Sequence, residues 1–401
     1  MTVKSHAPKI SVIIPVRNCP NVLRVCINSL QNSTYGDYEI IVVDDASTDR
    51  TPELATTLGI TLLRLERQCG PASARNRGAE IARGEYLFFV DADVRIHPET
   101  INQVVECFEQ NPEIEALFGS YDLAPQAFNI LSQYKNLFHH FVHQQGRPKA
   151  STFWSGCGAI KRSIFVKMRG FNPRYARPCI EDIELGARLY KEGHRIMLKK
   201  DIQVTHLKRW TLWNMLKADV KDRGIPWTEL ILRERNLPND LNLKFSQRLS
   251  AILAYGILAA ILIEGWHTPA LLLLPIGVLV AILGLDYWSE KRRVPTTLRA
   301  LAMIGVLGAI AAISYYGMKW LMLALAFLAG IILLNFRFYV FFARVRGHLF
   351  AALVIPLHVF YYLYSGASFV LGVGLYFWKT RILGLFKHRG LKTQAETMTI
   401  L

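Results

Sequence analysis

Cysteine is scarce in this sequence, and its six cysteines form no Cys-x-x-Cys pair. Six thiols in 401 residues are too few for a disulfide scaffold, and a cysteine metal site needs a tighter spacing. No Gly-x-Gly-x-x-Gly motif follows the first predicted strand, which argues against a dinucleotide-dependent dehydrogenase. Residues 1–9 also lack the charged-then-apolar pattern of an export signal. We therefore expect the N-terminal half to remain in the cytoplasm.

Acidic residues are rare in the C-terminal part of the chain. Residues 241–401 contain 15 Lys or Arg but only 4 Asp or Glu, and the whole chain has a formal net charge of +16. The chain is 51% hydrophobic, which excludes a disordered or collagen-like protein. Because the basic excess accompanies long apolar runs, it favours a membrane partner and no nucleic acid.

The apolar runs predict a membrane domain over residues 248–401. They cover residues 249–263, 269–285, 300–316, 320–336 and 349–378. Basic clusters follow the second, fourth and last runs, and this positive-inside pattern predicts four spans with a cytoplasmic N-terminal half. We expect a multi-pass protein of the cell inner membrane. The last run is expected to form a hairpin that turns near Ser365 and Gly366, with one long helix as the alternative.

Residues 211–247 have the pattern of a basic amphipathic helix. Leu212, Met215 and Val220 share one helical face, and Trp213 and Trp227 lie nearby. Such a stretch before a hydrophobic region predicts helices in the membrane interface. The alternative is a surface helix packed on its own domain.

Residues 1–210 form the remaining region, in which short β-branched runs alternate with helix-length segments. Strands are expected at 10–16, 38–44, 61–65, 86–91 and 114–119, with helices near 21–32, 51–58, 72–82 and 98–110. This alternation predicts an α/β fold, with helices on both faces of a mostly parallel sheet. Ligands of such sheets bind beyond the carboxyl ends of the strands, where this sequence has its clustered acids.

Two of these strand ends carry pairs of acids. Asp91 and Asp93 follow a buried strand, and two carboxylates at this spacing suit a magnesium or manganese ion that also binds phosphate. The alternative is a turn or a helix cap. Asp44 and Asp45 end the neighbouring strand and could accept hydrogen bonds from a base and a ribose, or cap the next helix. Arg75, near a helix N-terminus, could pair with a diphosphate or simply be a solvated surface residue.

Several motifs in order resemble the family 2 glycosyltransferases of the GT-A fold. They are the Ser-Val-Ile-Ile-Pro-Val segment ending at Val16, the Asp-Asp-x-Ser-x-Asp segment from Asp44, Ala-Arg-Asn-x-Gly at Arg75, Asp-x-Asp at Asp91 and a later Glu-Asp pair. The resemblance covers about residues 10–210. It implies a Rossmann-like GT-A catalytic domain that binds a nucleoside-diphosphate sugar and a divalent cation and inverts stereochemistry. An all-α transmembrane domain would follow.

The resemblance also implies roles for individual residues. It places Pro15, Asp44 and Asp45 in the nucleoside pocket, Arg75 near the base and phosphates, and Asp91 and Asp93 at the ribose and the metal. In the family the Asp of the Glu-Asp pair is the usual general base, which is Asp182 here. Its neighbour Glu181 would raise the pKa of one carboxyl group of the pair. The alternative for Asp182 is a simple helix cap.

A later segment, His206-x-x-Arg209-Trp210, resembles the Gln-x-x-Arg-Trp motif of processive family members. In those enzymes the Trp stacks on the acceptor and the Arg meets the diphosphate. His replaces Gln here, so His206 is alternatively a third metal ligand beside Asp91 and Asp93. The segment with Gly156 and Cys157 resembles the family's glycine-rich acceptor segment, with a plain turn as the alternative.

The acceptor follows from the chemistry of the nucleophile. A hydroxyl has a pKa far above 7 and needs a base, whereas a phosphate oxygen is already ionised. The retained acids at Glu181 and Asp182 therefore predict transfer to a hydroxyl of a lipid-linked sugar or glycolipid. The alternatives are a polyprenyl-phosphate glycosyltransferase, a processive polysaccharide synthase, and an inactive nucleotide-binding scaffold. The sequence does not indicate an oligomeric state.

Overall fold

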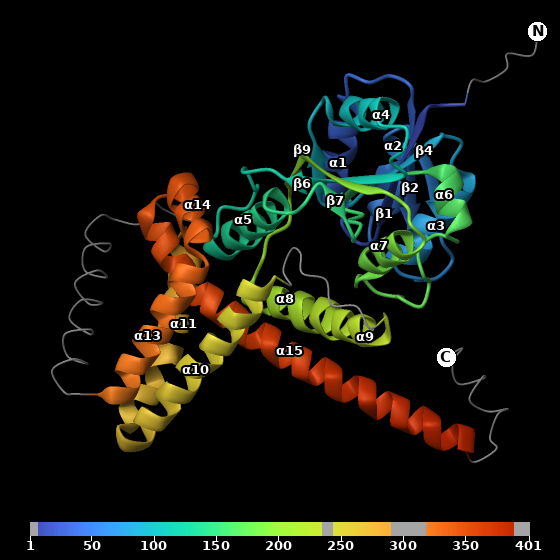
Figure 1. Cartoon of the computed structure of the whole chain (residues 1–401). Coiled ribbons are helices and arrows are strands. Elements are labelled where there is room, and N and C mark those ends of the chain that lie inside the picture. Colours follow the sequence, from blue (N-terminus) through green and yellow to red (C-terminus); the bar gives the residue numbers. More distant parts are fainter. Residues whose placement is uncertain (1–6, 235–243, 290–317, 389–401) are drawn as a thin grey trace, which may run out of the picture.

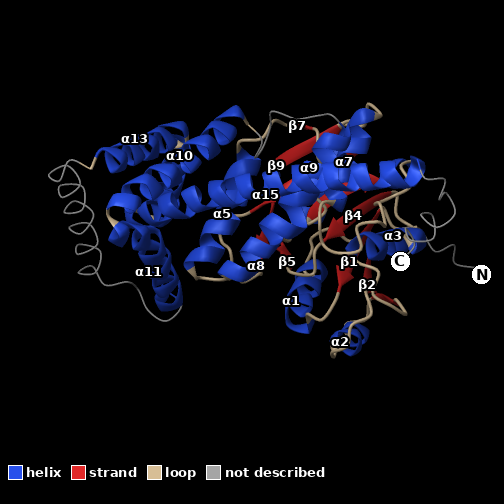
Figure 2. Cartoon of the chain, turned by 90° about the horizontal axis from the view of Figure 1, so that it is seen from below, coloured by secondary structure: helices blue, strands red, loops and turns tan. Residues whose placement is uncertain are grey.

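The computed structural model describes residues 7–234, 244–289 and 318–388. They form an α/β part and an all-helical part (Figure 1). Figure 2 shows that the strands are confined to one end of the molecule, while helices alone make up the other end. This division confirms the predicted order of an α/β domain followed by a helical region.

One sheet of nine strands runs through the described residues. The strands are β1 (Ile10–Val16), β2 (Tyr38–Asp44), β3 (Thr61–Arg64), β4 (Tyr86–Val90), β5 (Val94–Ile96), β6 (Ala116–Tyr121), β7 (Lys149–Ala150), β8 (Cys157–Lys161) and β9 (Ile196–His206). The order is β3-β2-β1-β4-β8-β6-β9-β5, with β7 paired to β9. Strands β1 to β4 are parallel as predicted, whereas β8 runs antiparallel to β4 and β6 and makes the sheet mixed.

Helices cover both faces of this sheet. They are α1 (Pro20–Gln31), α2 (Thr51–Thr57), α3 (Pro71–Ile81), α4 (Thr100–Gln110), α5 (Ile130–Gln144), α6 (Arg162–Lys167) and α7 (Glu181–Lys191). Apolar residues of α1 and α4 pack in one buried cluster, and those of α3, α6 and α7 in a second cluster. Strands β1, β2 and β4 place alternate residues in the two clusters, which fixes their register because a slip by one residue would exchange the faces.

The helical region begins with three consecutive pieces after β9. These are α8 (Leu212–Leu216), a π-helical segment (Lys217–Gly224) and α9 (Ile225–Glu234). Then follow α10 (Phe245–His267), a 3-10 turn (Pro269–Leu273), α11 (Leu274–Ser289), α13 (Lys319–Leu334), α14 (Phe336–Arg346) and α15 (His348–His388). Helices α8 and α9 occupy the stretch predicted to be amphipathic, and α9 lies along α15 (Figure 1). Their place in a membrane interface stays a prediction.

Two of the described helices are long and apolar enough to cross a membrane. They are α10 and the portion His348–Arg381 of α15. Helices α13 and α14 make a third candidate if the pair, bent by 74°, counts as one span. The predicted span at 300–316 lies outside the described residues. The described part of the chain therefore offers two or three spans.

The predicted hairpin near Ser365 and Gly366 is wrong. Both residues lie inside the continuous helix α15. Gly366 faces the ring of Tyr255 on α10, and a Cβ at this position would be 2.5 Å from that ring. The small residues are therefore used for close helix packing and not for a turn.

Candidate functional site

The acids at the end of β2 are buried and hold the loops that follow. Asp44 is fully buried, and both of its carboxylate oxygens accept hydrogen bonds from the Ser47 N–H at 3.3 Å. Asp45 accepts hydrogen bonds from the N–H groups of Cys69 (2.6 Å) and Gly70 (2.9 Å), at the start of α3. These bonds match the expected turn-building role, and the nucleoside contacts of both acids stay a prediction. Pro15 lies half-buried in β1, at the position that pairs with Val43.

Arg75 joins two of the predicted motifs. Its guanidinium, on α3, donates from Nη2 to Asp91 Oδ1 at 2.7 Å and from Nη1 to Glu181 Oε1 at 2.8 Å. It also lies over the ring of Phe171, 5.5 Å from the centroid. Burial disfavours the charge, but the two carboxylates outweigh it and raise the pKa of Arg75.

This arrangement corrects one interpretation of Arg75. The residue is only 4% exposed, so it is not a solvated surface residue. The Arg75 guanidinium, which we expected near a diphosphate, forms ion pairs with Asp91 and Glu181. The pairing was not predicted from the sequence, because it links residues 106 positions apart.

Asp182 has the environment of a base. It belongs to the first turn of α7 and keeps some exposed surface. Its Oδ2 accepts hydrogen bonds from the N–H (3.1 Å) and hydroxyl (3.3 Å) of Ser155, and its Oδ1 accepts one from the Ile183 N–H (2.8 Å). Burial and the adjacent charge of Glu181 raise the pKa of Asp182 to about 6. A carboxyl group with this pKa is largely ionised at neutral pH and still able to take a proton.

Asp93 and His206 come together at the facing ends of β5 and β9. His206 Nε2 lies 3.5 Å from Asp93 Oδ2. Burial works against ionisation of this carboxyl group, yet His206 lowers the pKa of Asp93 to about 2. On the opposite side of the imidazole, His206 Nδ1 lies 2.6 Å from Asn136 Oδ1. An amide oxygen can only accept, so Nδ1 carries the hydrogen and Nε2 faces Asp93.

This pair suits a divalent cation. Ligand atoms 2.0–2.1 Å from an octahedral ion lie about 3 Å apart, close to the 3.5 Å between Nε2 and Oδ2. The ring of Tyr121 stacks on His206 with centroids 4.3 Å apart and further restricts the imidazole. Asn136 and Tyr121 are site residues that the sequence analysis missed.

The predicted three-ligand set of Asp91, Asp93 and His206 is not assembled. Asp91 pairs with Arg75, and the described residues contain no group of three His, Cys, Asp or Glu side chains placed to hold a metal ion. Asp93 and His206 alone face each other. Magnesium usually keeps several waters and takes only one or two carboxylates beside substrate phosphates, so the single carboxylate of Asp93 is within this range, while the imidazole of His206 is not a typical magnesium ligand.

Two of the predicted acceptor contacts have other roles in the structure. Cys157 is 1% exposed and packs in the core at the start of β8, so its side chain is closed to an acceptor. Gly156 faces the indole of Trp154, and a Cβ there would come within 2.6 Å of that ring. Glycine is thus required for the close approach of the Trp154 indole, and an acceptor contact at Gly156 stays a prediction.

The third predicted acceptor contact, Trp210, is also enclosed. It is 3% exposed, lies in a buried cluster with Met215 and Phe338, and has the Lys208 ammonium 4.3 Å from its ring centroid. A sugar cannot stack on this ring in the structure. Arg209 is exposed, and its carbonyl accepts a hydrogen bond from the Asn214 amide at 3.3 Å. Its contact with a diphosphate stays a prediction.

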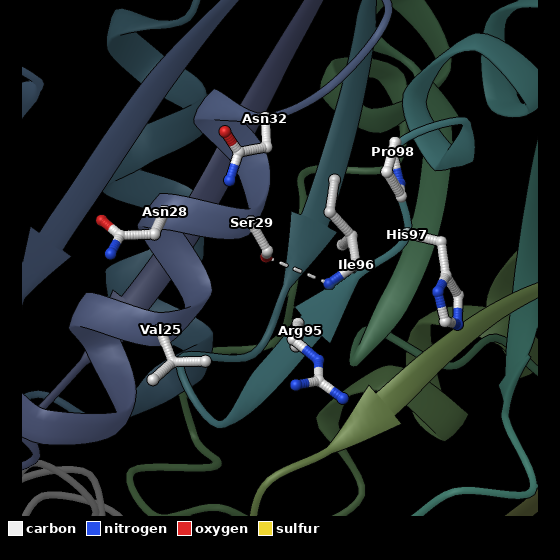
Figure 3. A pocket seen from close by; sticks show the side chains of 8 residues that line it. All are labelled: Val25, Asn28, Ser29, Asn32, Arg95, Ile96, His97 and Pro98. Carbon is white, nitrogen blue, oxygen red and sulfur yellow. Dashed lines mark hydrogen bonds between the residues drawn. The ribbon is translucent and has the colours of Figure 1, made fainter.

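A hollow of about 410 Å³ lies between α1 and β5, apart from these acids (Figure 3). Asn28, Ser29 and Asn32 line it from α1, and Arg95 lines it from β5. The Ile96 N–H donates to Ser29 Oγ at 3.1 Å and joins the two elements. None of the predicted site residues lines this hollow.

Comparisons with known proteins find matches to the α/β part. Residues 11–169 match the profile described as Glycosyl transferase family 2. An uncharacterized glycosyltransferase of Haemophilus influenzae is 31% identical over 191 residues, which make up 46% of this chain and 62% of that protein. The glycosyltransferase YibD of Escherichia coli is 41% identical over 95 residues, which make up 22% of this chain and 27% of that protein. The matches thus span less than two thirds of these relatives.

A solved structure shares the fold over most of the chain. It is the mannosyltransferase PcManGT from Pyrobaculum calidifontis, in complex with GDP-Man and Mn2+. The likeness covers 83% of this chain and 88% of that one, with 18% sequence identity and a TM-score of 0.50. At this identity the likeness shows the fold alone.

Proposed function

Because residues 11–169 form a domain of glycosyltransferase family 2, we propose that the protein transfers a sugar from a nucleoside-diphosphate sugar to a hydroxyl group of a lipid-linked sugar or glycolipid. The observation that carries the proposal is the carboxyl pair at the start of α7. Asp182 is partly exposed and has a pKa raised to about 6, while Glu181 is engaged in an ion pair with Arg75. One acid is thereby left free to act as a base.

The proposed reaction is a single displacement at the anomeric carbon. The acceptor oxygen forms a bond to that carbon as the bond to the diphosphate breaks, which inverts the configuration. Asp182 takes the hydroxyl proton as the new bond forms. Ser155 holds the carboxylate through two hydrogen bonds and orients it for this transfer.

Asp93 and His206 are the residues that would hold a divalent cation, manganese or magnesium. When bound, such an ion neutralises the negative charge that develops on the departing diphosphate. Asn136 accepts a hydrogen bond from Nδ1 and fixes the imidazole of His206, so that its Nε2 would be the ligand atom once it has lost its proton. Arg75 holds Asp91 directly after β4, two residues before Asp93 in the sequence.

We also propose that the protein is a multi-pass protein of the inner membrane with its catalytic domain in the cytoplasm. Helices α10 and α15 support this placement by their length and composition. Arg344 and Arg346 end α14, directly before the span that begins at His348, as the positive-inside rule expects of a cytoplasmic end. Helices α8 and α9 would then lie in the interface, with the exposed Trp213 as an anchor.

A nucleotide-binding and transfer assay tests this function. The full chain is purified in detergent and its thermal unfolding is followed with a panel of nucleoside diphosphates, with and without manganese. We expect one diphosphate to stabilise the protein more strongly with manganese, since a ligand that binds only the folded state raises its stability. The matching nucleotide sugar should then label a lipid extract with single sugars.

Each alternative function has a distinct outcome in this assay. Transfer to polyprenyl phosphate that persists in an Asp182→Asn variant would favour a phosphate acceptor. A long polymer would favour a processive synthase. Nucleotide binding without hydrolysis or transfer under any metal would contradict the enzymatic proposal and favour a scaffold.

A further inference from the structure

A second cavity, of about 730 Å³, lies where the α/β part meets the helical part. The segment after β6, from Leu123 to Gln133, forms one wall. The junction of α14 and α15 forms the other. Gly347 lies at this junction, between the two helices, and has a φ of 88°. Residues with a side chain rarely adopt this backbone conformation, so glycine is favoured at the turn.

The cavity is positively charged. Arg95, Arg346 and His348 line it, and no Asp or Glu is among its lining residues. Arg346 is held in place by neutral acceptors, since Nε donates to Gln133 Oε1 and Nη2 to the carbonyl of Leu123, both at 2.7 Å. No carboxylate of the described residues forms an ion pair with Arg346. The guanidinium is therefore oriented, and its charge is left for an anion.

The same cavity is also apolar. Phe128 is 80% exposed at its edge, and Leu349, Phe350 and Leu353 line it from the first two turns of α15. This end of α15 begins one of the candidate membrane spans, which starts at His348. An occupant must therefore match both an anion site and a hydrocarbon surface at the level where a span begins. A free phosphate meets only the first requirement.

The cavity adjoins the strands that carry the proposed cation ligands. Arg95 lies two residues after Asp93, on β5. The Gln126 N–H, from the wall of the cavity, donates to the carbonyl of His206 at 3.2 Å. An occupant would therefore contact β5 directly through Arg95, and it would touch a wall segment that is hydrogen-bonded to the end of β9.

We propose that this cavity binds an anionic phospholipid of the bilayer. Its phosphate lies between Arg95 and Arg346, and the first part of an acyl chain lies against Phe128, Phe350 and Leu353. The inference rests on the membrane placement of the proposed function. It goes beyond that function by assigning a lipid site separate from the acids that react.

Lipid titration of the full chain in detergent, read by native mass spectrometry, tests the site. We expect phosphatidylglycerol to bind more tightly than phosphatidylcholine. Arg346→Gln and Arg95→Gln should each weaken phosphatidylglycerol binding by about tenfold or more, since each removes one charge contact to the phosphate. Arg344→Gln is the matched control: Arg344 is exposed on the same helix, α14, but does not line the cavity.

Three results would overturn the lipid site. They are equal binding of the two lipids, equal affinity of the Arg346→Gln, Arg95→Gln and Arg344→Gln variants for phosphatidylglycerol, and full displacement of the lipid by inorganic phosphate. Thermal unfolding without lipid shows whether Arg346→Gln still folds, and Arg95→Gln tests the site independently. Sugar transfer is measured separately. If transfer is absent while the Arg-dependent lipid binding holds, the proposed reaction fails and the lipid site stands.

Discussion

Glu181 controls the basicity of Asp182 through its charge. The pKa of Asp182 is raised to about 6, by burial and by Glu181. A base must be deprotonated to work, so we expect kcat/KM for sugar transfer to fall about tenfold per pH unit below pH 6. Glu181→Gln removes the neighbouring negative charge, which lowers the pKa of Asp182 and moves this acid limb to lower pH. A pH profile of both proteins measures the shift.

Two further variants, at Asp182 and Ser155, test whether Asp182 is the base. Asp182→Asn should lower kcat by about 10²- to 10⁴-fold, because the base is lost while an oxygen that can accept the Ile183 N–H hydrogen bond is kept. Ser155→Ala removes one hydroxyl bond but keeps the backbone N–H bond to Asp182, so its acid limb should stay near pH 6. An Asp182→Asn protein with full activity would show that another group takes the proton.

Asn136 is a positioning residue for the cation site. It accepts a hydrogen bond from His206 Nδ1 at 2.6 Å. We expect Asn136→Leu to raise the manganese concentration for half-maximal activity by about 10- to 100-fold, since such partners set the orientation of ligating histidines. Asn136→Asp keeps an acceptor oxygen and should retain the wild-type manganese requirement. A merely structural role would lower the unfolding temperature of the Leu variant and leave its manganese requirement unchanged.

At the residue scale, the sequence predicted the positions of the acids at strand and helix ends better than it predicted their hydrogen-bond partners. Asp182, Asp93 and His206 lie where the motifs suggested, because motifs follow strand and helix ends. Arg75 and Trp210 were misjudged, because their environment comes from long-range packing that no local pattern records. The signal for Asn136, which is 1% exposed, was a row of polar residues on one face of α5 that includes Ser132, Gln133 and His140, and nothing in that row marked Asn136 as the partner of His206.

Among the elements, α15 shows how a local signal can mislead. Ser365 and Gly366 are typical turn residues in a soluble protein. Inside a long apolar helix they permit close approach to a neighbour, here Tyr255 of α10. In contrast, β1 and β2 match the predicted bounds, because short runs of Val and Ile in a buried parallel sheet leave few alternatives.

Gly366→Ala tests this packing. Its new methyl group meets the Tyr255 ring, which is held by the hydrogen bond from Tyr255 Oη to the carbonyl of Leu363 at 2.8 Å. We expect a loss of about 1–3 kcal/mol, measured by thermal unfolding in detergent. Gly374→Ala in the same helix is the control, because nothing lies within 4 Å of its new Cβ. Equal unfolding temperatures of the two variants would contradict the close contact.

The whole molecule is joined by a buried ion pair between its two parts. Lys135 Nζ, on α5, lies 2.6 and 2.5 Å from the two carboxylate oxygens of Asp219 in the π-helical segment. Tyr364 Oη, on α15, donates to the same carboxylate at 2.7 Å. Helix α5, the π-helical segment and α15 thus all contribute to the interactions of the Asp219 carboxylate. The sequence could not indicate this junction, since it depends on how the two parts dock.

Removing one partner should weaken the docking. Lys135→Met removes the nearest cation of the buried Asp219 carboxylate and leaves only the more exposed Arg223 guanidinium, 4.0 Å away, so we expect a loss of about 2–4 kcal/mol of stability. Lys191→Met removes the Lys191–Glu234 pair, whose lysine is 74% exposed, and should cost less than about 1 kcal/mol. Thermal unfolding compares the two, and limited proteolysis reports whether the parts separate. Identical profiles would contradict a role of this pair in docking.

The uninterrupted course of α15 has a consequence for the geometry of the protein in a bilayer. A helix of 41 residues is about 60 Å long, roughly twice the thickness of the hydrocarbon layer. It must either incline steeply or extend beyond the hydrocarbon as a rigid rod. Its first turns border the phospholipid cavity, and its later turns carry α9 through the pair of Lys379 and Glu229. A change in bilayer thickness that alters the tilt of α15 would therefore move the cavity and α9 together.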